Sequence, residues 1–335
     1  MMKVHVVSET IFPTRGNGVY TAFIDFIELL KEKNDVEVVL NGEGFGDVLH
    51  SHTYGPDFFR RGRRYKGKRI ITVHVIPDSI KGSLPFWKIL MPLVKWYFKK
   101  VYSYADVCIA ISPMVEHAIR DLGVDTRIIK IYNPVHIEKW KRTAEKRTEG
   151  RKMLGFSETD FIVLGVGQLE GRKGIDDFLD IAEAIPEAKF AWAGGRPFGL
   201  LTEGIARIDT RVAKNKRRVK FTGMVELDKM PYIYAAADLL LFPSYQENCP
   251  LAPLEATACG MPVVFRDIKE YTLLFETAYL KADTTNEFID LTKRLIQDKS
   301  FYAQGLRISE ELIMQFDKNK IREKLMHLYH ELSDK

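Results

Sequence analysis

The chain has 335 residues, and its 46% apolar and 28% charged composition is typical of soluble globular proteins. This length favours two domains over one, and no apolar run is long enough to cross a bilayer. The net charge of +5 is modest, and the first residues lack the pattern of a secretory signal. Three scattered cysteines, Cys108, Cys249 and Cys259, are too few for a disulfide framework, so we expect a reducing cytoplasm.

Short β-rich runs alternate with longer helical patterns along the first part of the chain. The predicted strands cover residues 4–7, 36–40, 47–50, 69–75, 107–111 and 128–132, and the predicted helices cover 19–33, 86–104 and 113–122. This alternation predicts βαβ units in a parallel sheet. Residues 138–153 are polar and highly charged, which suits a linker, so we expect the first domain to cover residues 1–145.

The alternation begins again after this segment. Predicted strands cover residues 161–167, 189–193, 219–222, 239–242 and 262–265, with a helix over 174–184. We therefore expect a second domain over residues 146–318, and an amphipathic helix at 319–335 that packs back on the first domain. Two consecutive doubly wound α/β domains predict a central cleft between them, lined by the carboxyl ends of strands.

Two glutamates, Glu247 and Glu255, lie eight positions apart on a predicted loop and the helix that follows it. The loop comes after a Phe-Pro-Ser sequence at 242–244, and the helix ends at a Gly-Met-Pro sequence. A helix N-terminus favours negative charge, which accounts for Glu255 alone but not for Glu247. We interpret the pair as carboxylates that hold separate hydroxyls of one nucleotide-sugar.

A glycine-containing turn follows the first predicted strand of each domain. Gly16 and Gly18 allow the backbone to approach a ligand where a helix begins, although such a pair is as often a structural turn. A dinucleotide fingerprint would need a third glycine where Thr21 stands and an acid where Leu40 and Asn41 stand. The sequence therefore disfavours an NAD-dependent oxidoreductase.

In the matching turn of the second domain, Arg172 and Lys173 stand just before a predicted helix. Positive charge at this end opposes the helix dipole and requires a compensating anion. A planar guanidinium beside an ammonium suits a diphosphate whose negative charge grows as it leaves. We therefore predict that the two cations stabilise a leaving group.

Three histidines lie at or near the ends of predicted strands. His74 ends a buried strand, where α/β folds present functional side chains, but an isolated histidine there is also often structural. His50 and His52 are separated by one residue and are expected to point to opposite faces of their strand. On that expectation they do not chelate one metal, and no metal site is predicted.

Several motifs occur in one order along nearly the whole chain, and with them the sequence resembles glycosyltransferase family 4. These are retaining enzymes of the GT-B fold that use nucleotide-sugars. The matching segments are Gly-Asn-Gly at 16–18, Thr-Val-His at 72–74, Ala-Ile-Ser-Pro at 110–113, Asn-Pro-Val at 133–135, Arg-Lys-Gly at 172–174, Phe-Thr-Gly at 221–223, residues 237–244 and the two spaced glutamates. The resemblance implies two Rossmann-like domains that face a central cleft.

The resemblance also implies roles for the candidate residues. The second domain would hold the nucleotide, with Glu255 on the ribose hydroxyls and with Arg172 and Lys173 on the diphosphate. Glu247 would position the transferred sugar, and His74 would contact a sugar hydroxyl near the reacting carbon. The catalytic candidates are thus His74, Glu247, Arg172 and Lys173, and neither a cofactor nor a metal is required.

The remaining donor-binding candidates lie in the glycine turns and at a helix start: Gly16, Asn17, Gly18, Gly167 and Leu251. By the resemblance, the first three would contact the distal phosphate. Many family members have an arginine where this chain has Gln168, and the loop before Arg172 is short. Phosphate binding is therefore expected to depend on fewer cations here.

Three short features resemble a narrower group, the bacterial 1,2-diacylglycerol 3-glucosyltransferases. They are the short loop before residue 172, the segment 50–55 and the segment 266–268. This resemblance implies UDP-glucose as the donor and diacylglycerol as the acceptor. The alternatives are a soluble acceptor, such as a sugar phosphate or a polysaccharide end, and a nucleotide-sugar-binding protein without catalysis.

Two features of the first domain favour attachment to an anionic membrane. Seven cations crowd into ten residues: Arg60, Arg61, Arg63, Arg64, Lys66, Lys68 and Arg69. The segment 87–101 repeats apolar residues at helical spacing, namely Trp87, Leu90, Met91, Val94, Tyr97, Phe98 and Val101, and it carries lysines on another face. Trp96 lies away from this stripe, and Pro92 is expected to delay the start of the helix.

Each lysine or arginine near an anionic leaflet contributes roughly 1 kcal/mol of attraction. We therefore predict peripheral attachment to the inner face of the cell membrane. Nucleic acid is a less suitable partner, because the basic runs lack interleaved aromatic residues for base stacking.

Overall fold

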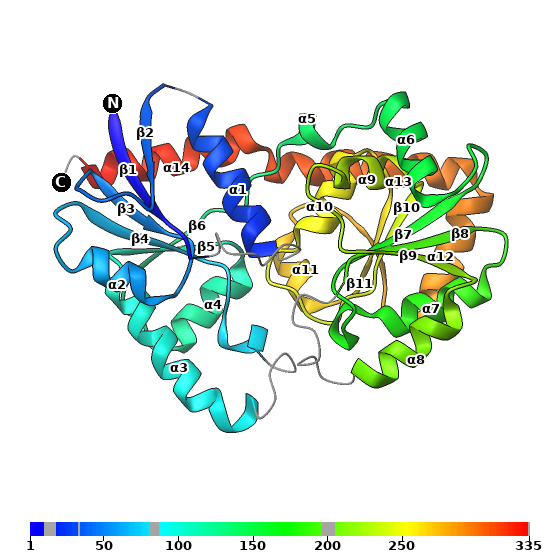
Figure 1. Cartoon of the computed structure of the whole chain (residues 1–335), viewed down its shortest axis with the longest axis horizontal. Coiled ribbons are helices and arrows are strands. Elements are labelled where there is room, and N and C mark those ends of the chain that lie inside the picture. The colour runs from blue at the N-terminus through cyan, green and yellow to red at the C-terminus, as the bar shows by residue number, and fades with distance from the viewer. Residues whose placement is uncertain (10–17, 33, 81–86, 196–204, 334–335) are drawn as a thin grey trace. The chain divides into compact units, whose positions relative to one another are not determined.

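The computed structural model describes residues 1–9, 18–32, 34–80, 87–195 and 205–333. The chain forms two compact units. Unit 1 comprises Met1–Pro134 and Phe316–Lys335, and unit 2 comprises Val135–Gln315. Figure 1 labels the helices and strands of both units, each of which has a central sheet with helices on its two faces.

Six strands form a parallel sheet in the described part of unit 1, in the order β2-β1-β3-β4-β5-β6. They are β1 Met2–Val7, β2 Val36–Leu40, β3 Val48–Ser51, β4 Lys68–Val73, β5 Val107–Ala110 and β6 Arg127–Lys130. The central strands β3 and β5 are buried along their whole length, as expected for parallel strands covered on both faces. The α/β class predicted for this part of the chain is confirmed.

The helices of unit 1 are α1 Gly18–Lys31, α2 Pro56–Gly62, η1 Pro77–Ile80, α3 Trp87–Tyr104, α4 Pro113–Asp121 and α14 Lys318–Ser333. Helix α4 has a well-defined start because Ser112 caps the backbone N–H of Val115 and Pro113 occupies the first turn. Pro92 lies inside α3, so the expectation that it delays the helix start is wrong. The helix tolerates it on an exposed face.

The C-terminal helix α14 packs on unit 1, as the sequence predicted. The hydroxyl of Tyr329 lies 2.6 Å from Nδ1 of His50 on β3, and both groups are buried. Arg322 forms an ion pair with Asp35 at 2.5 Å, and Arg127 donates two hydrogen bonds to Glu331. The last helix therefore belongs to the same compact body as the first strands.

Unit 2 contains a second parallel sheet, and its six described strands have the order β12-β11-β10-β7-β8-β9. They are β7 Ile162–Val166, β8 Lys189–Ala193, β9 Val219–Gly223, β10 Leu239–Phe242, β11 Val263–Arg266 and β12 Leu280–Ala282. Phe178, Phe190 and Trp192 meet edge to face in its core. A second doubly wound α/β body, also predicted, is thus confirmed.

The helices of unit 2 are α5 Ile137–Trp140, α6 Ala144–Leu154, η2 Gly171–Lys173, α7 Ile175–Ala184, α8 Ile205–Asn215, α9 Met230–Ala236, α10 Leu251–Ala258, α11 Lys269–Leu274, α12 Thr285–Gln297, α13 Lys299–Ile313 and η4 Met314–Phe316, whose last residue falls in unit 1. Within the described residues, no helix is both long enough and apolar enough to pass through a bilayer.

The polar segment 138–153 is part of unit 2 and not a linker. Trp140 is buried with its ring edge on Tyr234, and the guanidinium of Arg151 is buried in an ion pair with Asp238 at 2.9 Å. Gly150 packs so closely on α9 that an added Cβ would lie 1.9 Å from the Tyr232 carbonyl oxygen. The charges in this segment therefore serve helix packing, and the units divide at Pro134 and Val135 instead of at 145–146.

Candidate donor-binding site

The order in which the chain adds strands to the sheet of unit 2 reverses between two neighbouring strands, β7 and β10. From β7 the chain proceeds to β8 and β9 on one side, whereas β10, β11 and β12 extend the sheet on the other side. In open α/β sheets, ligands bind outside the carboxyl ends of the strands at such a switch point. The turns after β7 and β10 carry the predicted residues Gly167, Arg172, Lys173 and Glu247.

Lys173 and Glu247 form a short ion pair across this switch point. Nζ of Lys173 donates to Oε1 of Glu247 at 2.5 Å, and Oγ of Ser244 donates to the same oxygen at 2.6 Å. The Glu247 side chain is buried and Lys173 is largely buried, with only 16% of its side chain exposed. The structure therefore brings together one acid and one cation that the sequence placed in the same site.

Arg172 ties the two turns together. Its guanidinium donates to the carbonyl oxygen of Gln246 at 3.0 Å and lies 3.5 Å from a carboxylate oxygen of Glu170. Its own carbonyl oxygen accepts a hydrogen bond from the Tyr245 backbone N–H and lies 3.2 Å from the Ser244 hydroxyl oxygen. Both predicted cations thus lie at the mouth of one pair of turns.

The local charges control the ionisation of Glu247. Burial alone would raise the pKa of this carboxyl, but Lys173 and then Arg172 outweigh that effect and lower the pKa below its usual value. Glu247 is therefore ionised at neutral pH. A buried, ionised carboxylate that is held by two donors is suited to accept hydrogen bonds from sugar hydroxyls.

Two glycines have backbone conformations that the turn after β7 requires. Gly174 has a φ of +70°, and a Cβ built on it would lie 2.2 Å from the Pro243 carbonyl oxygen. Gly167 has a φ of +155°, and its carbonyl oxygen accepts a hydrogen bond from the Trp192 indole at 3.0 Å. Both positions suit glycine because other residues seldom adopt these φ values.

Leu251 and Glu255 lie on α10, the short helix that follows the second turn. Leu251 is its first residue and is buried, and Pro250 before it offers no side-chain cap. Glu255 is buried, and one of its carboxylate oxygens accepts a hydrogen bond from the Tyr234 hydroxyl at 2.7 Å. Burial, followed by the nearby Glu255, raises the pKa of Tyr234 far above its usual value, so Tyr234 stays a donor.

The sequence alone did not point to two residues that hold this region together, Tyr234 and Arg266. Tyr234 lies on α9, 21 residues before Glu255, and no local pattern relates the two positions. Arg266 forms an ion pair with Asp177 at 3.0 Å and lies over the ring of Tyr245, which itself donates to Asp177. Arg266 was noticed only as part of a segment resembling a subgroup, whereas in the structure it supports the loop that carries Glu247.

The other candidates lie in unit 1. His74 follows β4 and is buried, with Nε2 3.1 Å from Nδ1 of His52. Gly18 is the first residue of α1, whereas Gly16 and Asn17 lie outside the described residues. Of the three candidates predicted in this glycine turn, the structure thus describes only Gly18.

His50 and His52 do not point to opposite faces of their strand, so that expectation is wrong. Their rings are stacked with centroids 4.7 Å apart. The side-chain direction in a strand repeats every two residues, so positions separated by one residue share a face. His50 also contacts the hydroxyls of Tyr329 and Thr72, at 2.6 and 2.7 Å.

Burial keeps this histidine cluster neutral. Desolvation lowers the pKa of His74 to about 4 and, together with the neighbouring His74, lowers that of His50 to about 3. The pKa of His52 is also well below its usual value, first because of burial and then because of the two neighbouring histidines. The described part of unit 1 therefore presents His74 as a neutral imidazole.

Comparison with known proteins identifies the family of the chain. Residues 17–139 match the family described as Glycosyltransferase Family 4, and residues 160–298 match Glycosyl transferases group 1. An alpha-galactosylglucosyldiacylglycerol synthase of Streptococcus pneumoniae is 35% identical over 272 residues, which cover 79% of this chain and 72% of that protein. A processive diacylglycerol alpha-glucosyltransferase of Acholeplasma laidlawii is 24% identical over 99% of this chain and 98% of its own length.

Among solved structures, HepE of Anabaena in complex with UDP-glucose superposes with a TM-score of 0.78 at 18% identity, covering 99% of this chain and 100% of that one. The likeness supports the fold expected from the two parallel α/β sheets. On these matches the chain belongs to glycosyltransferase family 4, as a retaining, nucleotide-sugar-dependent glycosyltransferase of the GT-B fold.

Proposed function

We propose that the protein transfers glucose from UDP-glucose to 1,2-diacylglycerol at the surface of a membrane, with retention of the anomeric configuration. The choice of acceptor is supported by the two relatives, whose names both include diacylglycerol. UDP-glucose as donor is supported by its presence in the complex of the structurally similar HepE. Unit 2 acts as the donor-binding domain in this proposal.

The Lys173–Glu247 ion pair is the observation that carries the proposal. The ammonium group of Lys173 has three N–H donors. It bonds to Glu247 and lies over the Phe242 ring, which leaves a donor for a phosphate oxygen. Lys173 and Arg172 then face the diphosphate and stabilise the negative charge that develops as UDP leaves. Glu247 positions the glucose hydroxyls and does not act as a nucleophile.

Glu255 and Leu251 complete the donor site on α10. The Tyr234 hydroxyl fixes the Glu255 carboxylate, which accepts hydrogen bonds from the ribose hydroxyls. The N-terminus of α10 at Leu251 has no side-chain cap, and free backbone N–H groups at such a position favour a phosphate. His74, neutral in unit 1, serves as a hydrogen-bonding group for the sugar.

The surface of α3 supports attachment to the membrane. Ile89, Leu93 and Trp96 recur at helical spacing and expose 77%, 62% and 58% of their area, away from the buried Phe98 and Val101. This exposed apolar stripe is flanked by Lys88, Lys95 and Lys99. An apolar stripe beside a row of cations is the pattern of a helix that lies in the interface of an anionic bilayer. We place the protein at the inner face of the cell membrane.

The test is mass spectrometry of the products formed from mixed UDP-, GDP- and ADP-sugars with vesicles that contain diacylglycerol. The expected product is a glucosyldiacylglycerol formed from UDP-glucose. Flotation with anionic liposomes addresses the acceptor, because an enzyme with a soluble acceptor stays in the unbound fraction. If UDP is not released with any acceptor, the protein only binds the donor, and the proposed reaction is contradicted.

A further inference from the structure

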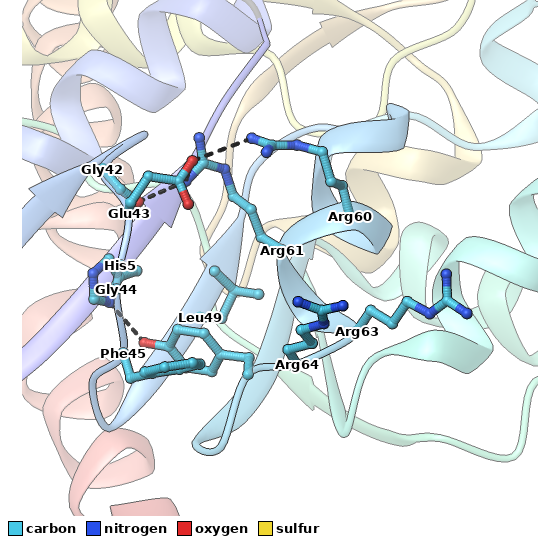
Figure 2. Close-up of a pocket in the computed structure, with 11 residues that line it drawn as sticks. His5, Gly42, Glu43, Gly44, Phe45, Leu49, Arg60, Arg61, Arg63 and Arg64 are labelled. Atoms are coloured by element: carbon cyan, nitrogen blue, oxygen red, sulfur yellow. Dashed lines mark hydrogen bonds and ion pairs between the residues drawn. The ribbon is translucent and has the colours of Figure 1, made fainter.

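A cavity lined only by residues of unit 1 is shown in Figure 2. Its volume is about 460 Å³. The connection between β2 and β3 at residues 42–45 forms one wall, and the end of α2 with the residues after it forms the other. His5 of β1 and Leu49 of β3 also line it. This volume falls within the range of small-molecule sites.

The lining of this pocket is strongly positive. Four arginines and one acid, Glu43, line it, and a second acid, Asp57, pairs with two of the arginines. The four guanidinium groups are thus opposed by two carboxylates, which leaves an excess of two positive charges. His5 adds no charge at neutral pH, because burial lowers the pKa of its imidazole below the usual value.

The four arginines have different environments. Arg60 and Arg61 bond to Asp57, and Arg61 also donates to the carbonyl oxygens of Asn41 and Gly42 at 2.8 and 2.6 Å. These two residues hold the wall in place. By contrast, the guanidinium groups of Arg63 and Arg64 are exposed and have no hydrogen-bond or ion-pair partner in the part of the chain that the structure describes.

The wall opposite these cations is held in place by hydrogen bonds, and it carries two aromatic rings. Nδ1 of His5 lies 2.8 Å from the Tyr65 hydroxyl, which donates to the Val48 carbonyl oxygen at 2.9 Å. The Tyr65 and Phe45 rings lie near one another, with centroids 6.1 Å apart. Gly44 has a φ of +110°, a conformation that favours glycine and keeps this wall free of a side chain.

We propose that this pocket binds a phosphate ester, with Arg63 and Arg64 as the groups that grip the phosphate oxygens. A guanidinium presents a planar fork of donors that matches two oxygens of one phosphate. The cavity is larger than a bare phosphate needs, so the organic part of the ester lies against Phe45 and Tyr65. The same chemistry occurs in a phospholipid headgroup and in a soluble sugar or glycerol phosphate. The site is independent of the proposed sugar transfer.

The test uses the full chain and two probes. Glycerol 3-phosphate is titrated by calorimetry, and binding to phosphatidylcholine vesicles with and without phosphatidylglycerol is measured by flotation. The Arg63→Gln/Arg64→Gln double variant is compared with Lys216→Gln/Arg217→Gln, which removes the same charge from exposed positions in unit 2. Thermal unfolding of each variant checks its fold.

The wild type is expected to bind at least one probe, and the Arg63/Arg64 variant to bind it at least about tenfold more weakly, since two charge-assisted contacts are lost. The Lys216/Arg217 control stays within about twofold of the wild type. Dependence on Arg63 and Arg64 with glycerol 3-phosphate identifies a soluble ester as the ligand. Dependence seen only with phosphatidylglycerol vesicles identifies a lipid headgroup.

Three results would overturn the proposal. One is that neither probe binds, and another is that the control loses as much affinity as the Arg63/Arg64 variant. The third is an Arg63→Lys/Arg64→Lys variant that binds like the wild type, because charge without the planar fork would then suffice. None of these measurements requires sugar transfer. The Arg63/Arg64 variant leaves the exposed apolar residues of α3 unchanged, so a loss of binding in that variant reports on the pocket and not on α3.

Discussion

Ser244 and Lys173 donate hydrogen bonds to the same oxygen of Glu247, at 2.6 and 2.5 Å. Loss of the hydroxyl in Ser244→Ala is expected to destabilise the fold by about 1 kcal/mol and to leave the ion pair in place. A double-mutant cycle with Glu247→Gln, followed by urea denaturation, checks this. Strictly additive effects of the two changes would mean that the hydroxyl and the carboxylate do not interact.

The Glu247 carboxylate is expected to contribute pH-dependent stability. Its pKa is lowered in the folded state, so its contribution is present above the unfolded pKa and is lost as the pH falls through the folded pKa. The stability difference between the wild type and Glu247→Gln should therefore be large at pH 7 and narrow in acid. Urea denaturation at pH 7 and near pH 4 measures it, and a difference that widens in acid would contradict the assignment.

Glu255→Ala is expected to weaken UDP binding about tenfold or more, because a charged hydrogen-bond partner typically contributes about 1.5 to 3 kcal/mol. Tyr234→Phe is the matched control, since it removes the hydroxyl that fixes the carboxylate but keeps the carboxylate itself. A smaller loss is expected there. Calorimetry with UDP gives both values, and unchanged affinity in Glu255→Ala would exclude the ribose-binding role.

The buried histidines should make the protein less stable as the pH falls below about 6.5. Their folded-state pKa values are lowered, to about 3 for His50, so the unfolded chain takes up protons that the folded chain does not. Each such histidine contributes a slope of up to about 1.4 kcal/mol per pH unit. His50→Gln should flatten the fall in thermal stability between pH 7 and pH 5.

The exposed His117→Gln is the control for this slope. It removes a histidine of the same unit without touching the buried cluster. An equal change of slope in both variants would show that the cluster has no special part in the acid sensitivity.

Leu93→Ser combined with Trp96→Ser should reduce binding to anionic vesicles about tenfold or more. Each of these side chains contributes on the order of 2 kcal/mol when it leaves water. Met153→Ser removes an exposed apolar side chain from unit 2 and should leave vesicle binding unchanged. Flotation measures all three proteins, and equal binding by all of them would remove α3 from the membrane contact.

Much of the fold was predictable because its signals are local. Runs such as Val107–Ala110 are apolar throughout, and their alternation with helical segments indicates parallel sheets. The polar segment 138–153 shows where this reasoning fails. Its charges are those of a linker in the sequence, yet Arg151 is buried against Asp238, 87 residues later in the chain.

The site shows the same division between local and distant information. The order of motifs was enough to name Lys173 and Glu247, which the fold brings into contact. The partners that hold the site residues, such as Tyr234 for Glu255, come from other elements and leave no pattern in the sequence. Trp96 was recognised as lying outside the predicted apolar stripe, but the exposed Ile89 and Leu93 of α3 were missed, because a helical stripe alone does not tell which face is covered.

Gly174 and the Pro243 carbonyl approach so closely that a methyl group on the glycine would lie 2.2 Å from that oxygen. Close backbone packing at Gly174, together with the hydrogen bonds of Arg172, thus sets the spacing between the turn that carries Lys173 and the loop that carries Glu247. The distance between Lys173 and Glu247 is therefore fixed by the backbone at Gly174, and exchange of neighbouring side chains should hardly alter it. Attempts to change the donor specificity of this enzyme toward a bulkier sugar should therefore vary residues around this ion pair and leave Gly174 and Pro243 unchanged.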